Sequence, residues 1–189
     1  LEREKNKIRM ITTDGHRLAF IEKDSSKNTP GGAKESVLLT RKGVMEIRKL
    51  LDERDGECRL SITQKNVLIK KEETILNVRL HEGEFPDYKK VIPTDNDRRI
   101  DADKNTLLSS LKRVSILSAD KIKGVKFNFS KSKLILSSSS PDIGEATEEL
   151  DVDYNGEEIE IAFNARYMID VLEAMEEQRA GIYLKDPLS

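Results

Sequence analysis

Asp14 and His16 are the residues of this sequence whose types and spacing best fit a catalytic or metal-binding site. A carboxylate and an imidazole two residues apart can act together as a general base, or each can supply a metal ligand. His81 is the only other histidine, and no second ligand motif accompanies the pair. A histidine beside a turn is usually a surface residue, and an Asp-Gly-His triplet is a weak motif alone. We therefore expect no enzyme, and keep catalysis as an alternative that bound zinc or hydrolytic turnover would support.

The residues around this pair predict a β-hairpin. Residues 8–13 alternate between two faces as a strand does, and residues 18–21 continue as a second strand. The Asp-Gly pair between them is a two-residue hairpin signal, because glycine adopts a positive φ without steric cost. His16 and Arg17 are therefore expected beside a turn, on a rim rather than in a core.

Composition limits the class of protein. The 189 residues suffice for one large or two small domains, and a net charge of −2 gives no global basic character. The single cysteine, Cys58, excludes an intrachain disulfide and a cysteine zinc cluster. No apolar run exceeds four residues, so no membrane-spanning helix is expected. Without a signal peptide, and with an opening Leu1 and an abrupt end at Ser189, the sequence is interpreted as a cytoplasmic fragment of a longer protein.

Hydrophobic periodicity predicts helices near 41–53, 104–117 and 165–176 among short strands, which indicates an α+β fold. The turn formers of residues 93–97 predict a domain boundary, which gives domains 1–93 and 94–189. Strands are expected near 7–13, 17–22, 36–39, 57–63, 66–71, 74–81, 124–130, 133–139, 145–152, 159–163 and 181–185.

Two parts of the sequence resemble each other. Residues 37–40 lead into the first predicted helix, and residues 161–164, placed 124 positions later, lead into the third. Thr40 and Asn164 are both suitable N-caps for these helices. A repeat of this length indicates duplicated domains rather than a solenoid. The alternative is a chance similarity of two strand–helix–strand units.

Charge is unevenly distributed. Segment 141–160 has nine acidic residues and no basic one, whereas segment 104–126 has six basic residues and one acidic residue. At 100° per residue, Lys42 and Lys49 lie opposite the apolar arc of their helix, which includes Leu51, and Lys112 projects away from the stripe of Leu107, Leu111 and Val114. A single exposed lysine merely solubilises a surface, so only alignment across several helices would create a surface for phosphates.

Ile116 lies about 180° from the apolar stripe of its helix, which predicts outward exposure with Leu117 near the edge. An exposed isoleucine at a helix end can mark a subunit contact. The alternative is that the helix has already ended and Ile116 turns into the core.

Several motifs together resemble one family, the bacterial DNA polymerase III beta subunit or sliding clamp. They are Thr-Asp-Gly-His-Arg-Leu-Ala at 13–19, Arg-Lys-Gly at 41–43, Gly-Glu-Phe-Pro-Asp-Tyr at 83–88, Ile-Leu-Ser at 116–118, Gly-Val at 124–125 and Phe-Asn at 163–164. The resemblance covers essentially the whole chain. It implies that residues 1–93 are the later part of the middle domain and residues 94–189 most of the last domain, truncated at its C-terminal end.

The resemblance implies a DNA-clamp fold: duplicated domains with helices on one face of curved antiparallel sheets. It further implies a DNA polymerase processivity factor, associated with the nucleoid, that encircles duplex DNA as a head-to-tail homodimer and needs no cofactor or metal. Lys42, Lys49 and Lys112 would then face phosphates without sequence preference. Ile116 and Leu117 would lie at the dimer interface of the full-length protein.

The resemblance also implies a pocket, between the middle and last domains, for short linear motifs of DNA polymerase, clamp loader and repair proteins. Its residues here would be Thr13, Gly15, His16, Arg17 and Leu18 from the hairpin, with Pro86, Lys90 and Val91. Lys90 stands where the family usually has arginine, which weakens any bidentate contact. Family residues that close the pocket would follow Ser189, so the pocket is expected to be incomplete. The competing function is a protein-interaction module of duplicated α+β domains that does not bind DNA.

Overall fold

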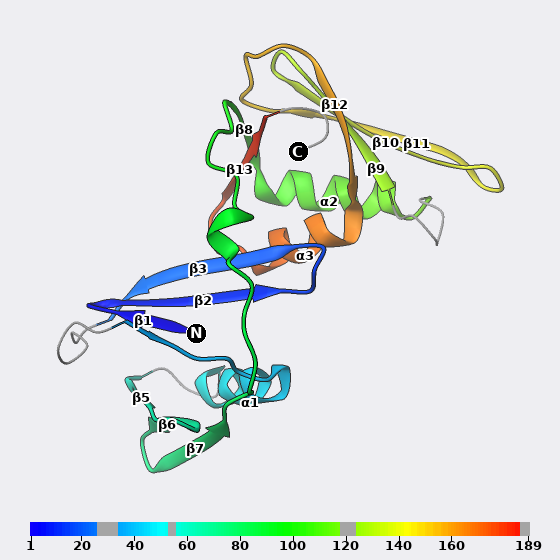
Figure 1. Ribbon diagram of the computed structural model, residues 1–189. Coiled ribbons are helices and arrows are strands. Elements are labelled where there is room, and N and C mark those ends of the chain that lie inside the picture. Colours follow the sequence, from blue (N-terminus) through cyan, green and yellow to red (C-terminus); the bar gives the residue numbers. More distant parts are fainter. Residues whose placement is uncertain (26–33, 53–55, 118–123, 186–189) are drawn as a thin grey trace. The chain divides into compact units, whose positions relative to one another are not determined.

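The structure is a computed structural model that describes residues 1–25, 34–52, 56–117 and 124–185. The chain divides into two compact units, Leu1–Val91 and Ile92–Ser189, and each contains helices and antiparallel sheets (Figure 1). None of the helices in the described ranges has the length and hydrophobicity that a bilayer crossing requires.

The first unit contains two antiparallel sheets and one α-helix. One sheet has the order β3-β2-β1-β4 and the other the order β5-β6-β7, and the helix α1 (Arg41–Asp52) packs on β6 and β7. The strands are β1 (Glu2–Glu4), β2 (Lys7–Thr13), β3 (Leu18–Asp24), β4 (Glu35–Ser36), β5 (Cys58–Ile62), β6 (Asn66–Lys71) and β7 (Thr74–Arg79). A 3-10 turn, η2 (Tyr88–Lys90), follows near the end of the unit.

Gly43 explains why α1 can pack closely on β7. The amide of Gly43 donates to Thr40 Oγ1 at 3.1 Å, so Thr40 caps the helix as predicted. A Cβ atom on Gly43 would collide with Val78 Cγ1 of β7. The glycine therefore allows the contact from which the small core of this unit is built, which includes Ile47 and Val67.

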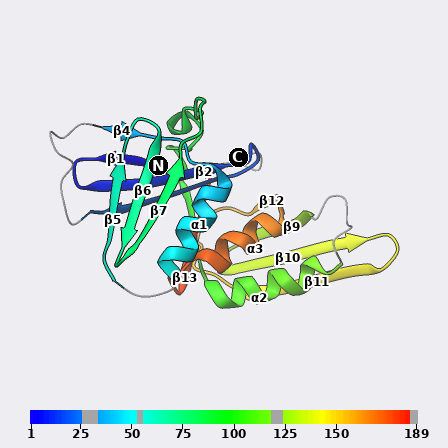
Figure 2. The ribbon, with the colours of Figure 1, turned by 90° about the horizontal axis from the view of Figure 1, so that it is seen from below.

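The second unit has a four-stranded antiparallel sheet, a two-stranded sheet and two α-helices. The sheet orders are β11-β10-β9-β12 and β13-β8. Helix α2 packs on β9, β10 and β11 and contacts α3, and the two helices lie side by side (Figure 2). The elements are β8 (Arg98–Asp103), α2 (Lys104–Ser115), β9 (Gly124–Ser130), β10 (Lys133–Ser140), β11 (Gly144–Asp151), β12 (Ile159–Asn164), α3 (Ala165–Ala174) and β13 (Arg179–Leu184).

The apolar stripe predicted for α2 and the N-cap predicted for α3 are both confirmed. The predicted stripe of Leu107, Leu111 and Val114 is buried against the aromatic core formed by Phe127 and Phe129. The N-cap of α3 is Asn164, whose side chain accepts a hydrogen bond from Arg166 N at 3.0 Å.

The two units share a chain path, which supports duplication over chance similarity. The sheets β3-β2-β1-β4 and β11-β10-β9-β12 have the same order of strands. A hairpin forms one side of each sheet, the strand that precedes this hairpin in the sequence lies next to it, and a strand that follows the hairpin in the sequence lies at the other edge. The strand at that end, β4 or β12, precedes α1 or α3, and these helices begin at Arg41 and Ala165, 124 residues apart as the sequence repeat predicts.

Some expectations were wrong in detail. The connection between β2 and β3 comprises four residues, 14–17, rather than two. The strand expected at 36–39 is only Glu35–Ser36, with Leu39 in a single bridge to Leu80. Leu51, placed in the apolar arc of α1, is 41% exposed because it lies in the last turn of the helix.

Candidate functional site

The turn at residues 14–17 is organised by Asp14. Its carboxylate accepts hydrogen bonds from the backbone amides of His16 (3.1 Å) and Arg17 (3.0 Å) and from Arg17 Nε (3.1 Å). These amide hydrogen bonds, with the Arg17 guanidinium, hold the pKa of the Asp14 carboxyl below its ordinary value. Gly15 has a φ of +87°, as a turn residue requires. The side chain of Asp14 thus builds the wider, four-residue turn.

The turn presents its side chains outward, as the sequence predicted. Thr13, Gly15, His16 and Arg17 are exposed, and Leu18 at the start of β3 is half-buried. Thr13 and Leu18 form the last pair of the β2–β3 ladder. The Thr13 hydroxyl donates to the carbonyl of Arg17 at 2.8 Å, which closes the turn.

The hydrogen bonds of Asp14 bear on the alternative interpretation of Asp14 and His16 as a catalytic pair. The carboxylate of Asp14 already accepts from two backbone amides and the Arg17 guanidinium. Within the described ranges, no group of three or more His, Cys, Asp or Glu side chains could hold a metal ion. The turn therefore offers exposed polar groups for contact.

The second group of candidate residues lies in the segment that ends the first unit. Pro86, Lys90 and Val91 are all exposed, and Val91 is 62% exposed. Lys90 Nζ lies 3.3 Å from Asp87 Oδ2 in a local ion pair. The side chain of Tyr88, between them, is buried. The segment thus shows both apolar and cationic side chains to solvent while one aromatic residue fixes it.

A cavity of about 930 Å³ in the first unit is lined by two of the candidate residues, Thr13 and Pro86. Gly15, His16, Arg17, Leu18, Lys90 and Val91 are not part of its wall. The lining also contains apolar residues that sequence reasoning did not select: Met10, Ile11, Leu38 and Phe85. Phe85 could have been found, because it directly precedes Pro86 in the motif, whereas Met10 and Leu38 have the pattern of ordinary core residues.

The three candidate DNA-facing lysines are exposed, as their helical positions predicted. Lys49 Nζ lies 3.0 Å from Glu46 Oε1 in α1, and Lys112 Nζ lies 2.6 Å from Glu173 Oε1 of α3. Lys42 lines a second cavity, of about 620 Å³, beside β7. Two of the three ammonium groups therefore have an exposed carboxylate neighbour.

Ile116 follows the last residue of α2 and is 75% exposed. The helix has ended, as one alternative supposed, yet the side chain does not turn into the core. Leu117 is half-buried. Ser118, the third residue of that motif, and the basic residues Lys121 and Lys123 lie outside the described residues.

The fold is that of the bacterial sliding clamps. A crystal structure of the DNA polymerase sliding clamp from Pseudomonas aeruginosa matches 98% of the chain with a TM-score of 0.93 and 33% identity, over 51% of its own length. A clamp structure from the same organism, bound to griselimycin, matches 98% of the chain with a TM-score of 0.91 and 33% identity, over 50% of its length. These similarities confirm the predicted α+β clamp fold.

The chain belongs to the DNA polymerase III beta subunit family. Residues 1–87 match its central domain and residues 89–189 its C-terminal domain. The beta sliding clamp of Escherichia coli (strain K12) is 36% identical over 188 residues, which cover 100% of this chain and 50% of that protein. The chain thus spans about half the length of the curated relatives it matches, and the resemblance deduced from the motifs is confirmed.

Proposed function

We propose that this chain acts as part of a DNA polymerase processivity factor, a ring-shaped homodimer that encircles and slides on duplex DNA. The family match along the whole chain carries this proposal. A ring retains DNA by topology, so it requires neither base readout nor catalysis. In this function the protein needs no cofactor and works in the cytoplasm, at the nucleoid.

Lys42, Lys49 and Lys112 are proposed to contact phosphates weakly. The neighbouring carboxylates of Glu46 and Glu173 support a weak contact for Lys49 and Lys112, because either lysine must share or leave its ion pair to bind a phosphate. Weak contacts suit sliding, since a strong bond to one phosphate would have to break at every step.

Changing the three lysines together to alanine is expected to weaken binding to a short duplex and reduce its salt dependence. Each lost phosphate contact lowers the slope of log K against log salt by about 0.9. Fluorescence anisotropy at several salt concentrations measures this slope. Lys133→Ala on β10, where Lys133 pairs with Asp151 at 3.2 Å, is the matched control. An unchanged slope in the triple variant would reject the assignment of these lysines.

The ring itself is tested on the full-length protein. A sliding ring is retained on circular DNA and escapes from short linear DNA, whereas an interaction module that does not bind DNA is retained on neither. Gel filtration with both DNA forms separates the two functions.

The hairpin turn and the segment around Pro86 are proposed to bind short peptide motifs of polymerase, clamp loader and repair proteins. Leu18, Pro86 and Val91 would supply apolar walls for a leucine or phenylalanine, and Thr13, Gly15, His16, Arg17 and Lys90 a polar rim. The exposure of these groups, with Leu18 half-buried, supports the proposal. So does the griselimycin-bound relative, which gives ligand binding a precedent in the family.

Ile116 and Leu117 are proposed to contact the second subunit. An isoleucine that is 75% exposed at a helix end gains most from coverage by a partner. Changing both residues to serine in the full-length protein is expected to yield monomers in analytical ultracentrifugation. Val171→Ser, at a side chain that is 50% exposed on α3, is the control. A double variant that sediments as a dimer would contradict the proposed interface.

A further inference from the structure

The end of the first unit is held by a single buried side chain. Among residues 81–91, all of which the structure describes, Tyr88 alone is buried. The last backbone hydrogen bond before it, from His81 N to Leu38 O (2.8 Å), lies seven residues earlier. The positions of Pro86, Lys90 and Val91 therefore depend on how Tyr88 is fixed.

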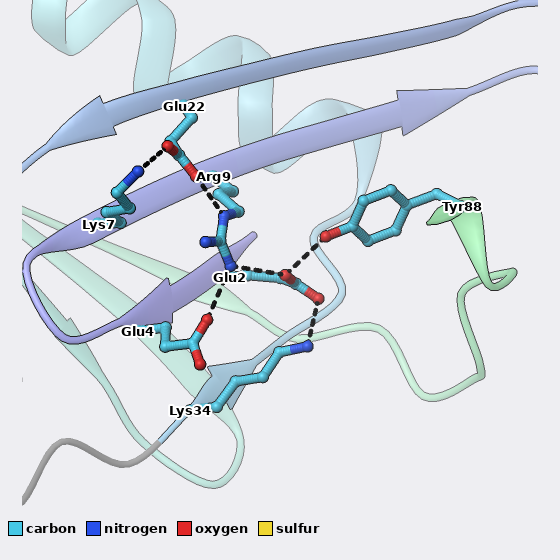
Figure 3. A network of polar contacts seen from close by, with 7 residues as sticks. All are labelled: Glu2, Glu4, Lys7, Arg9, Glu22, Lys34 and Tyr88. Carbon is cyan, nitrogen blue, oxygen red and sulfur yellow. Dashed lines mark hydrogen bonds and ion pairs between the residues drawn. The ribbon is translucent and has the colours of Figure 1, made fainter. Parts of the chain in front are cut away.

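Tyr88 makes two contacts with the β3-β2-β1-β4 sheet. Its hydroxyl donates to Glu2 Oε2 of β1 at 3.0 Å, a buried hydrogen bond between residues 86 positions apart (Figure 3). Its ring packs on Phe20 of β3, with ring centroids 6.0 Å apart. Phe20 lies two residues after Leu18, so both side chains occupy the same face of β3. The Tyr88–Phe20 contact thus connects the segment to the strand that carries Leu18.

A balanced ionic network holds Glu2 in place as the acceptor. Lys34 Nζ lies 3.1 Å from Glu2 Oε1, and Arg9 Nη1 lies 3.9 Å from Glu2 Oε2. Arg9 also binds Glu4 (2.9 Å) and Glu22 (2.6 Å), and Lys7 binds Glu22 as well (Figure 3). Three carboxylates therefore face three cations, which keeps Glu2 ionised although burial opposes its charge.

The tyrosine keeps its proton as the donor. Burial, together with the hydrogen bond to the Glu2 carboxylate, raises the pKa of Tyr88 above its ordinary value. The pair thus consists of a protonated hydroxyl and an ionised carboxylate at neutral pH. A hydroxyl that donates to an ionised carboxylate makes a stronger hydrogen bond than one between two neutral groups.

We propose that Tyr88 is a positioning residue, which uses its hydrogen bond to Glu2 and its contact with Phe20 to set Pro86, Lys90 and Val91 relative to Leu18. The inference rests on the proposed peptide site for its effect on binding. Its geometric part, the fixing of the segment, stands apart from that function. The side chain of Tyr88 is 8% exposed and lines the same cavity as Pro86, so it supports the wall of that cavity as well as the segment.

The first experiment needs no peptide. In ¹⁵N-labelled protein, Tyr88→Phe is expected to shift the amide resonances of residues 89–91. Hydrogen exchange is expected to speed about fivefold, the factor for one lost hydrogen bond, at Lys90 and Val91, whose amides donate to Asp87 O and Tyr88 O at 3.1 Å. The amides of β6 are expected to stay unchanged, which shows that the fold is intact. Unchanged exchange at Lys90 and Val91 in Tyr88→Phe would overturn the inference.

The second experiment uses the full-length protein and measures binding of a fluorescein-labelled octapeptide that carries leucine and phenylalanine. Tyr88→Phe is expected to raise its Kd about fivefold. Glu2→Gln, which keeps an oxygen acceptor for the hydroxyl, is expected to retain more affinity than Glu2→Ala. Equal Kd values for Tyr88→Phe and wild type, with binding present, would overturn the positioning role. Absence of binding by wild type would instead reject the peptide site, and the exchange result would still decide the geometry.

Discussion

Leu18→Asp is expected to abolish capture of a short peptide that carries leucine or phenylalanine, with a rise in Kd of about thirtyfold or more. The half-buried Leu18 side chain is proposed as an apolar wall, and a carboxylate there would have to be desolvated against an apolar peptide side chain. The fold is expected to survive, because Leu18 belongs to neither hydrophobic core.

Titration of the ¹⁵N-labelled full-length protein with the peptide measures this effect even when affinity is low. Ala19→Asp is the matched control, since it places the same charge one residue further along β3, where the side chain points to the opposite face. Equal affinities for Leu18→Asp and wild type would remove Leu18 from the site. Equal losses in both variants would indicate a general charge effect.

Phe127→Ala is expected to destabilise the second unit by about 3–5 kcal/mol, the range for deleting a fully buried aromatic ring. The ring centroid of Phe127 lies 5.1 Å from that of Phe163, in an edge-to-face contact, and 5.9 Å from that of Phe129. Its removal leaves a void in the centre of the larger core.

Urea unfolding monitored by NMR separates the two compact units. The amides of α2 and β9 are expected to unfold at lower urea in the variant, while those of α1 and β6 are unchanged. Ile143→Ala, at a side chain that is 68% exposed, serves as the control. A decrease of less than about 1 kcal/mol in the free energy of unfolding would show that the core closes around the missing ring.

Much of the fold was predictable because its signals are local. The buried stripe of α2 repeats at helical spacing, and Asn164 precedes an apolar run as an N-cap does. Strands β1 and β8 escaped prediction because they are mostly charged. Only Ile100 and Ala102 of β8 are buried apolar residues, and β1 consists of Glu-Arg-Glu.

The candidate site was predictable in part. The exposure of Lys42, Lys49 and Lys112 follows from helical geometry, and the Glu46–Lys49 pair follows from its spacing of three residues. The Lys112–Glu173 pair joins two helices that are far apart in the sequence, so no local sequence pattern predicts it. The same holds for the Tyr88–Glu2 hydrogen bond. The choice of pocket residues came from the family resemblance, because exposed turn residues have no periodicity of their own.

The close approach of α1 to β7 at Gly43 couples the sizes of the side chains that positions 43 and 78 can carry. Any side chain at position 43 must displace the Val78 methyl groups or lift the helix from the strand. Relatives that carry alanine at the first position should therefore carry a smaller residue at the second. We therefore expect the glycine of the Arg-Lys-Gly motif to be kept, or exchanged together with the residue 35 positions away, for reasons of space rather than DNA contact.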